Sequence, residues 1–124
     1  MPKKILIIDD EAAFTYLVKL NLEKTGKYDV RVENKGALGL PAAIEFKPDM
    51  IFLDIVMPDM DGSDVALQLS ENSVTRAVPV VFLTAIIDKE EVDDNDSVIG
   101  GRKFLAKPVR VDELINCIEG TLRK

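Results

Sequence analysis

Histidine is absent from this sequence of 124 residues, and its absence limits the chemistry that the chain can perform. A chain without histidine holds no Ser-His-Asp triad, no Cys-His pair and no histidine-ligated zinc site. It also has no histidine that could carry a phosphoryl group. Any reaction on this chain must therefore use carboxylates, lysine or hydroxyl groups.

Cysteine and long apolar runs are scarce as well. Cys117 is the single cysteine, which excludes an internal disulfide framework and fits a small core residue. No apolar run approaches the roughly 18 residues that a membrane-spanning helix needs. The apolar run 5–8 is too short for a signal peptide. These features predict a soluble protein of the reducing cytoplasm, without membrane insertion.

The balance of charge is acidic, because 22 Asp and Glu residues against 16 Lys and Arg residues give a net charge of −6. This balance argues against direct binding of nucleic acid and against attachment to an anionic membrane surface. Hydrophobic residues make up 47% of the chain and charged residues 31%, as in an ordinary globular domain. We therefore treat residues 1–124 as one domain.

Short apolar runs alternate with amphipathic stretches along the chain. The runs lack the alternation of half-exposed strands, which indicates strands buried on both faces of a parallel sheet. We predict five such strands, around residues 5–8, 30–32, 50–53, 78–83 and 104–106. Strands that alternate with helices predict a doubly wound α/β domain.

The stretches between the strands show helical patterns. Apolar residues at helical spacing precede Gly26, which would end the first helix. Pro41, within the second pattern over residues 36–46, must kink the helix or lie near its start. Ser63 is placed to cap a third helix over residues 64–71, and Asp112 or a neighbour to open the last.

The stretch 88–97 fits a helix poorly, because Asp and Asn are weak residues for a helix interior. The fold nevertheless needs a crossover helix here, so we expect a short or mobile helix. A solvated acidic face and a patch that a partner recognises are both compatible with its charge.

Polar residues follow directly after four of the predicted strands. They are Asp9, Asp10 and Glu11 after the first, Asp54 after the third, Thr84 after the fourth and Lys107 after the fifth. Open parallel sheets bind ligands beyond the carboxyl ends of the strands, where the strand order reverses. In a sheet of order 2-1-3-4-5 this point lies between the first and third strands. Asp9, Asp10 and Asp54 would therefore meet there.

Three carboxylates in one crevice repel one another, at a cost of about 1–4 kcal/mol for a pair roughly 4 Å apart. A divalent cation relieves this repulsion, and an all-oxygen site favours Mg²⁺ or Mn²⁺. Lys107 and Thr84 suit the oxygens of a phosphoryl group, as a point charge and a hydroxyl donor. The combination predicts phosphoryl transfer, with an aspartate as the natural acceptor.

Each of these residues has a simpler interpretation when it is considered alone. Asp10 could cap a helix, Thr84 could form a turn, and Lys107 before Pro108 could be a solvated turn residue. These interpretations are independent of one another, whereas a phosphoryl-transfer site explains four strand ends together.

Several segments resemble the motifs of response-regulator receiver domains. Residues 54–62, Asp-Ile-Val-Met-Pro-Asp-Met-Asp-Gly, resemble the phosphoacceptor loop of that family. Residues 9–11, 47–49, 84–85 and 104–108 resemble its other motifs, in the same order and at suitable spacing. The resemblance extends from Lys3 to about Leu122. It implies a receiver domain over residues 1–124 with a flavodoxin-like, three-layer α/β/α fold, a five-stranded sheet of order 2-1-3-4-5 and five helices.

The resemblance also implies how the phosphoryl group is handled. Asp54 would be phosphorylated by a partner histidine kinase or a histidine phosphotransfer protein. Lys107, with a cis peptide bond to Pro108, and Thr84 would bind phosphoryl oxygens. Phe104 would turn inward when Thr84 shifts. The domain would act as a phosphorylation switch of a two-component system or phosphorelay, not as an enzyme, apart from slow loss of its own phosphoryl group.

A metal site is implied by the same resemblance. Asp10 and Asp54 would ligate Mg²⁺ or Mn²⁺ through carboxylate oxygens, and Asp9 would act largely through a bound water. The backbone carbonyl of Val56 would be a further ligand.

Two neighbours of this site depart from the family pattern, in which they are often polar. Val56 follows Asp54 by two residues, and Ile86 follows Thr84 by two. Apolar side chains beside the phosphoryl group would hinder an attacking water. We therefore expect the phosphorylated form of Asp54 to be long-lived.

Two other classes of function stay open. A pseudo-receiver, which is an unphosphorylated interaction domain of the same fold, usually lacks the acceptor aspartate or the acidic pair, and this sequence keeps both. An aspartyl-phosphate phosphatase needs a second aspartate two residues after its nucleophile, where this chain has Val56. Binding of a nucleotide has no support, because the sequence has no Gly-x-Gly-x-x-Gly or Walker-type loop.

Overall fold

A computed structural model describes residues 2–85, 98–99 and 102–123 of the chain. Its six-stranded sheet has the order β2-β1-β3-β4-β6-β5. The strands are β1 (Lys3–Ile8), β2 (Tyr28–Glu33), β3 (Met50–Asp54), β4 (Val80–Thr84), β5 (Val98–Ile99) and β6 (Arg102–Ala106). The helices are α1 (Ala12–Lys24), the short 3-10 helix η1 (Gly36–Leu38), α2 (Gly39–Phe46), α3 (Gly62–Glu71) and α4 (Val111–Leu122).

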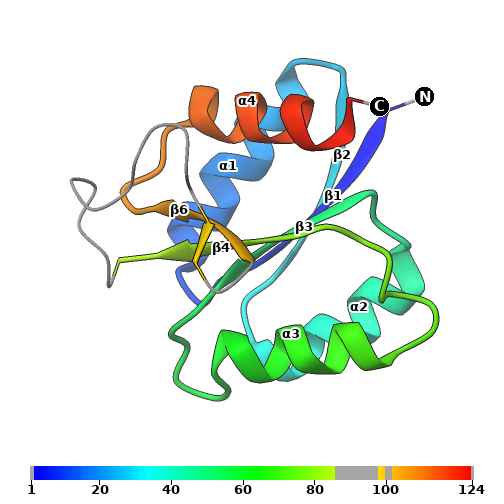
Figure 1. Cartoon of the computed structure of the whole chain (residues 1–124). Helices are drawn as coiled ribbons and strands as arrows, with labels where there is room; N and C mark the ends of the chain where they lie inside the picture. Colours follow the sequence, from blue (N-terminus) through cyan, green and yellow to red (C-terminus); the bar gives the residue numbers. More distant parts are fainter. Residues whose placement is uncertain (1, 86–97, 100–101, 124) are drawn as a thin grey trace.

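The helices lie in two layers that cover opposite faces of the sheet. Helices α1 and α4 lie on one face, and α2 and α3 lie on the other (Figure 1). Strands β1, β2, β3, β4 and β6 are all parallel to their neighbours in this group. The predicted doubly wound sheet, with five parallel strands in the order 2-1-3-4-5, is confirmed.

Two details differ from the predictions, and one prediction is not tested. A two-residue strand, β5, pairs antiparallel with β6 at the sheet edge. Two residues are too few to show a periodic pattern in the sequence. Five helices were predicted, whereas the described residues contain four α-helices and η1. The acidic helix predicted for 88–97 lies outside the described residues, as does Ile86.

The predicted cap of α3 is also wrong. The N-cap residue is Asp61, and Ser63 lies inside the first turn of the helix. Extended backbone at Asp61 lets the helix begin at Gly62, two residues earlier than predicted. Pro41 is the third residue of α2, near its start, where a missing backbone N–H costs little.

Alternate residues of the central strands enter two separate apolar layers, because side chains of a strand point to opposite faces in turn. Ile5 and Phe52 pack in the layer beneath α1 and α4. Leu6 and Leu53 pack in the layer beneath α2 and α3. Every residue of β3 is buried, so this strand separates the two layers.

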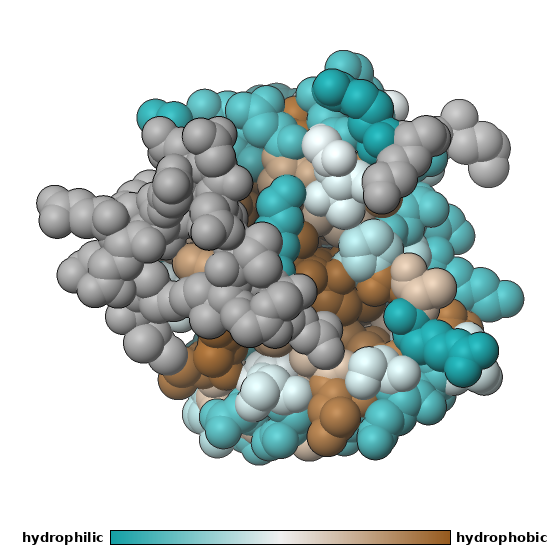
Figure 2. Space-filling view, viewed as in Figure 1, coloured by the Kyte–Doolittle hydropathy of each residue, from teal (hydrophilic) through white to brown (hydrophobic). Residues whose placement is uncertain are grey.

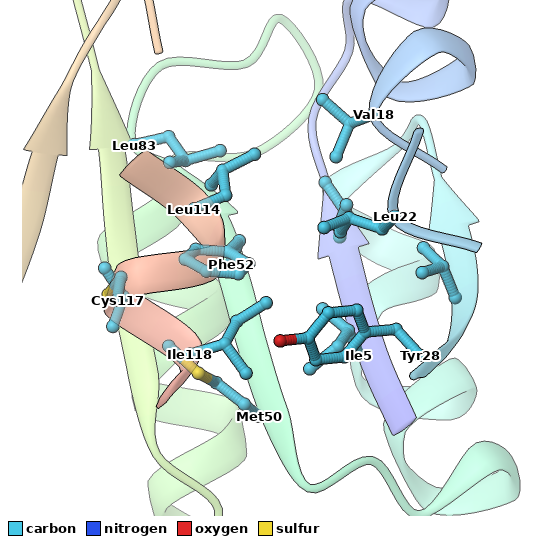
Figure 3. Close-up of a cluster of buried hydrophobic side chains, with 13 residues drawn as sticks. Ile5, Val18, Leu22, Tyr28, Met50, Phe52, Leu83, Leu114, Cys117 and Ile118 are labelled. Atoms are coloured by element: carbon cyan, nitrogen blue, oxygen red, sulfur yellow. The ribbon is translucent and has the colours of Figure 1, made fainter. Parts of the chain in front are cut away.

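The layer beneath α1 and α4 shows how the outer helices close the core. Figure 3 shows Leu114 of α4 beside Phe52 of the sheet, and Val18 and Leu22 of α1 belong to the same apolar layer. Burial of a large apolar side chain such as Phe52 stabilises the fold by about 1.5–3 kcal/mol. Hydrophilic residues cover much of the outer surface of the helical layers, and hydrophobic residues reach the surface between them (Figure 2). None of the described helices has the length and apolar character needed to cross a membrane.

Candidate functional site

The strand register brings the predicted site residues to one end of the sheet. Ile8 of β1 is aligned with Leu53 of β3, so the residues that follow, Asp9 and Asp54, end neighbouring strands at the same level. Thr84 of β4 is aligned with Ala106 of β6, which places Lys107 directly beyond it. The backbone N–H of Lys107 then donates to the carbonyl oxygen of Thr84 at 2.8 Å.

Three carboxylates gather at this end of the sheet. Asp9, Asp10 and Asp54 each offer one carboxylate oxygen, and these oxygens all lie within 4.8 Å of one another. Asp9 is fully buried and Asp54 is 5% exposed. An open cleft above them is lined by Asp10, Glu11, Asp54, Val56, Ala85 and Lys107.

Burial, with repulsion from neighbouring carboxylates, makes Asp9 and Asp54 hard to ionise. Desolvation, and then the charge of Asp9, raise the pKa of Asp54 to about 7, although the ammonium of Lys107 acts in the opposite direction. Desolvation likewise raises the pKa of Asp9, against the lowering effect of its hydrogen bonds with Lys107 and the backbone of Glu11. Without a bound cation, the ionised forms of Asp9 and Asp54 are therefore disfavoured at this end of the sheet.

Lys107 is the cation of the site. Its Nζ lies 2.8 Å from Oδ2 of Asp9, 2.6 Å from Oε1 of Glu11 and 3.7 Å from Oδ2 of Asp54. Burial by itself would lower the pKa of Lys107, but these carboxylates outweigh burial and hold the pKa above its usual range. The peptide bond to Pro108 is cis, which confirms the isomer that the family resemblance implied.

The residues present fit a divalent cation. The buried Oδ2 of Asp9 forms an ion pair with the ammonium of Lys107 at 2.8 Å. An ionised carboxylate oxygen accepts more than one contact, so it retains capacity for a further ligand. With Asp10 and Asp54 alongside, the donor set consists of oxygens, as Mg²⁺ and Mn²⁺ prefer.

The loop after β3 is held close to its own strand by Gly62. The backbone N–H of Gly62 donates to the carbonyl oxygen of Ile55 at 2.7 Å. A Cβ atom at Gly62 would lie 2.2 Å from the carbonyl oxygen of Asp54, so only glycine allows this approach. Within the loop, the backbone N–H of Val56 donates to Oδ1 of Asp54 at 3.3 Å, which helps to orient the carboxylate.

Hydrogen bonds also join this loop to the segment before α2. The carboxylate of Asp59 accepts from the backbone N–H groups of Gly36 and Ala37, both at 3.0 Å. Gly36 itself lies against Met57 and Met60 of the loop. The loop therefore has anchors at both its middle and its end.

Some residues that build the site gave no signal on their own in the sequence. Glu11 was noted only as a neighbour of the acidic pair, yet it binds Lys107. The side chain of Asn34 donates to the carbonyl oxygen of Asp9 at 2.8 Å and to Oγ1 of Thr15 at 3.0 Å, which fixes the start of the acidic turn. Only the pairing of β1 with β2 brings Asn34 there, so no local motif could have shown it.

The structure also locates the remaining predicted site residues. Thr84 and Phe104 are buried, and they lie on the neighbouring strands β4 and β6. Val56 is 56% exposed and borders the cleft. The roles predicted for these residues, and for Asp9, Asp10, Asp54 and Lys107, stay predictions.

The doubly wound fold and its acidic cleft with a partly buried lysine define a class of α/β domain with a ligand site at the switch point of the sheet. Residues 5–119 match the response regulator receiver domain family. A crystal structure of a response regulator receiver domain protein (CheY-like) from Methanospirillum hungatei has a TM-score of 0.82 and 25% identity, covering 99% of this chain and 95% of that one.

Two relatives differ in how much of their own length this chain spans. The DNA-binding dual master transcriptional regulator RpaA of Synechocystis is 38% identical over 125 residues, which is 100% of this chain but 50% of RpaA. Protein PilH of Pseudomonas aeruginosa is 35% identical over 121 residues, which is 96% of this chain and 97% of PilH. The chain belongs to the response regulator receiver domain family of two-component systems.

Proposed function

We propose that Asp54 accepts a phosphoryl group from a phosphohistidine of a partner protein, which would be a histidine kinase or a histidine phosphotransfer protein. The observation that carries this proposal is the convergence of Asp9, Asp10 and Asp54 within 4.8 Å, beside Lys107, in a chain of the receiver family. The domain would then act as a phosphorylation switch of a two-component system or phosphorelay.

The transfer needs little from the protein beyond positioning and charge. One carboxylate oxygen of Asp54 forms a bond to phosphorus while the bond from phosphorus to the imidazole nitrogen breaks. The imidazole keeps the electron pair of that bond, and Asp54 becomes an acyl phosphate. Lys107 and Thr84 would bind the phosphoryl oxygens, through an ammonium and a hydroxyl group.

A divalent cation fits the same cleft. We propose that Mg²⁺ or Mn²⁺ is held by the carboxylates of Asp10 and Asp54, with Asp9 largely through water, and by the backbone carbonyl of Val56. When bound, the cation supplies positive charge that relieves the repulsion among the carboxylates and stabilises charge on the phosphoryl oxygens. The convergence of three carboxylates within 4.8 Å and the raised pKa of Asp54 support this assignment.

The proposal is tested by incubating the chain with phosphoramidate, a small phosphodonor, and Mg²⁺. We expect the mass to increase by one phosphoryl group, and we expect Asp54→Ala to abolish the increase. Asp64→Ala, which removes an exposed aspartate from the first turn of α3, is the matched control and should be phosphorylated normally. Equal phosphorylation of the Asp54→Ala variant would refute the assignment.

An unphosphorylated interaction domain of the same fold is less well supported. The site retains the acidic cluster and Lys107 together, and this arrangement is costly unless a cation or a phosphoryl group uses it. We further propose that the domain switches without being an enzyme and without contacting nucleic acid itself, in keeping with its net charge of −6.

A further inference from the structure

Lys107 forms its shortest contact with Glu11, not with the proposed acceptor. Nζ lies 2.6 Å from Oε1 of Glu11 and 2.8 Å from Oδ2 of Asp9, but 3.7 Å from Oδ2 of Asp54. Charge-assisted hydrogen bonds have N–O distances of about 2.7–2.9 Å. The ammonium is therefore bound by the first two carboxylates and only approaches the third.

The side chain of Glu11 is available to bind Lys107 because it does not cap helix α1. Glu11 is the N-cap residue of α1, yet its side chain does not cap the helix. Its backbone is fixed, since its N–H donates to Oδ1 of Asp9 at 2.9 Å and its carbonyl oxygen accepts from the N–H of Thr15 at 3.0 Å. The side chain, which is 59% exposed, reaches Lys107 across 96 positions of sequence.

This contact opposes the state in which Lys107 binds a phosphoryl group. Nζ lies 2.6 Å from Oε1 of Glu11 but 3.7 Å from Oδ2 of Asp54, so a phosphoryl oxygen on Asp54 would compete with the carboxylate of Glu11 for the ammonium. Glu11 also lines the cleft through which a phosphodonor reaches Asp54, so its charge repels the anionic donor.

We propose that Glu11 is a positioning residue that holds the ammonium of Lys107 away from Asp54 until a phosphoryl group displaces it. The inference rests on the function proposed above. Glu11 then sets how readily the unphosphorylated chain accepts a phosphoryl group, and it does so through a contact that phosphorylation must break.

The test compares Glu11→Gln, Glu11→Asp and the wild-type chain. Glutamine removes the charge at constant shape, whereas aspartate keeps the charge but is one methylene shorter and retracts from Lys107. Glu71→Gln is the matched control, because Glu71 is an exposed acidic residue at the end of α3. The readouts are the rate of phosphorylation by phosphoramidate with Mg²⁺ and the affinity for beryllofluoride, a phosphoryl mimic, measured by NMR titration.

We expect both Glu11 variants to react about two- to fivefold faster and to bind beryllofluoride more tightly by a similar factor, the scale of a partly exposed ion pair. Glu71→Gln should match the wild-type chain. Unchanged or slower Glu11 variants would overturn the inference, and so would faster Glu11→Gln with unchanged Glu11→Asp, which would show an effect of charge alone. Failure of the wild-type chain to be phosphorylated would refute the proposed function instead.

Discussion

Strand β3 joins two very different regions, because its faces contact apolar layers and its last residue, Asp54, contacts like charges. Phe52 and Leu53 are fully buried among apolar side chains, where each contact stabilises the fold. One residue further, desolvation and the charge of Asp9 raise the pKa of Asp54 to about 7. The apolar layers thus stabilise the fold, whereas holding the acidic residues together at the carboxyl end of the sheet costs part of that stability.

The largest effect should follow from disturbing the point where the two regions meet. A Cβ atom at Gly62 would lie 2.2 Å from the carbonyl oxygen of Asp54, and backbone cannot move aside as a flexible side chain can. We expect Gly62→Ala to lower the free energy of unfolding by about 3 kcal/mol, measured by urea denaturation, and to slow phosphorylation.

Gly120→Ala is the matched control for that substitution. A Cβ atom at Gly120 would meet nothing within 4 Å, and Gly120 lies within α4. Alanine should therefore raise the free energy of unfolding by about 0.5–1 kcal/mol through helix propensity. Similar destabilisation by both substitutions would show that the close approach of backbone at Gly62 does not cause the loss of unfolding free energy.

A smaller effect, of opposite sign, should follow from removing charge at the carboxyl end of the sheet. The pKa of Asp54 is raised to about 7 in the folded chain from 3.8, so folding favours its protonated form. The metal-free wild-type chain should lose stability as the pH rises from about 4 through about 7. Above that window, Asp54→Asn should be more stable by about 1–3 kcal/mol, because relaxation of the site absorbs part of the repulsion.

Urea denaturation in EDTA across pH 4–8 measures this difference. Asp64→Asn, which removes an exposed aspartate, should follow the wild-type curve. A difference between Asp54→Asn and the wild-type chain that stays constant with pH would contradict the raised pKa.

Mg²⁺ should stabilise the wild-type chain by relieving the repulsion among the carboxylates at the carboxyl end of the sheet. A cation that binds only the folded chain stabilises it by about 1.4 kcal/mol when its concentration is tenfold above its dissociation constant. We expect millimolar Mg²⁺ to raise the melting temperature of the wild-type chain and to raise that of Asp54→Asn much less, as scanning calorimetry would show. Absence of any shift would count against the metal assignment.

The smallest effect concerns the apolar residue at the rim of the cleft. Val56 is 56% exposed at the rim of the cleft, and its apolar side chain would offer no hydrogen bond to a water that attacks a phosphorylated Asp54. One such hydrogen bond contributes about 0.5–1.5 kcal/mol, so Val56→Asn should speed hydrolysis about two- to tenfold. Loss of phosphorylated protein after removal of the donor measures the rate.

Val74→Asn, at a similarly exposed valine away from the cleft, should leave hydrolysis unchanged. A lifetime of seconds for the phosphorylated wild-type chain with Mg²⁺ would contradict the expectation that its acyl phosphate is long-lived.

Local patterns predicted the parallel sheet because each central strand is a short apolar run with polar residues directly after it. Residues 5–8 followed by Asp9, and residues 50–53 followed by Asp54, need no knowledge of their neighbours to be read in this way. The cap of α3 was misread, since Asp61 and Ser63 are both plausible caps and only backbone geometry distinguishes them. Strand β5 escaped notice because two residues carry no periodicity.

The sequence by itself determined which residue types stand at the strand ends, and hence the class of chemistry that this domain can support. Pairing of distant strands decided the rest, because contacts such as Glu11 with Lys107 and Asn34 with Asp9 join residues far apart in the chain. The pKa of Asp54 is likewise a tertiary property, since it depends on how deeply the carboxylate is buried and on the charge of Asp9 beside it. The sequence supplied the charged groups, and the fold decided how strongly they interact.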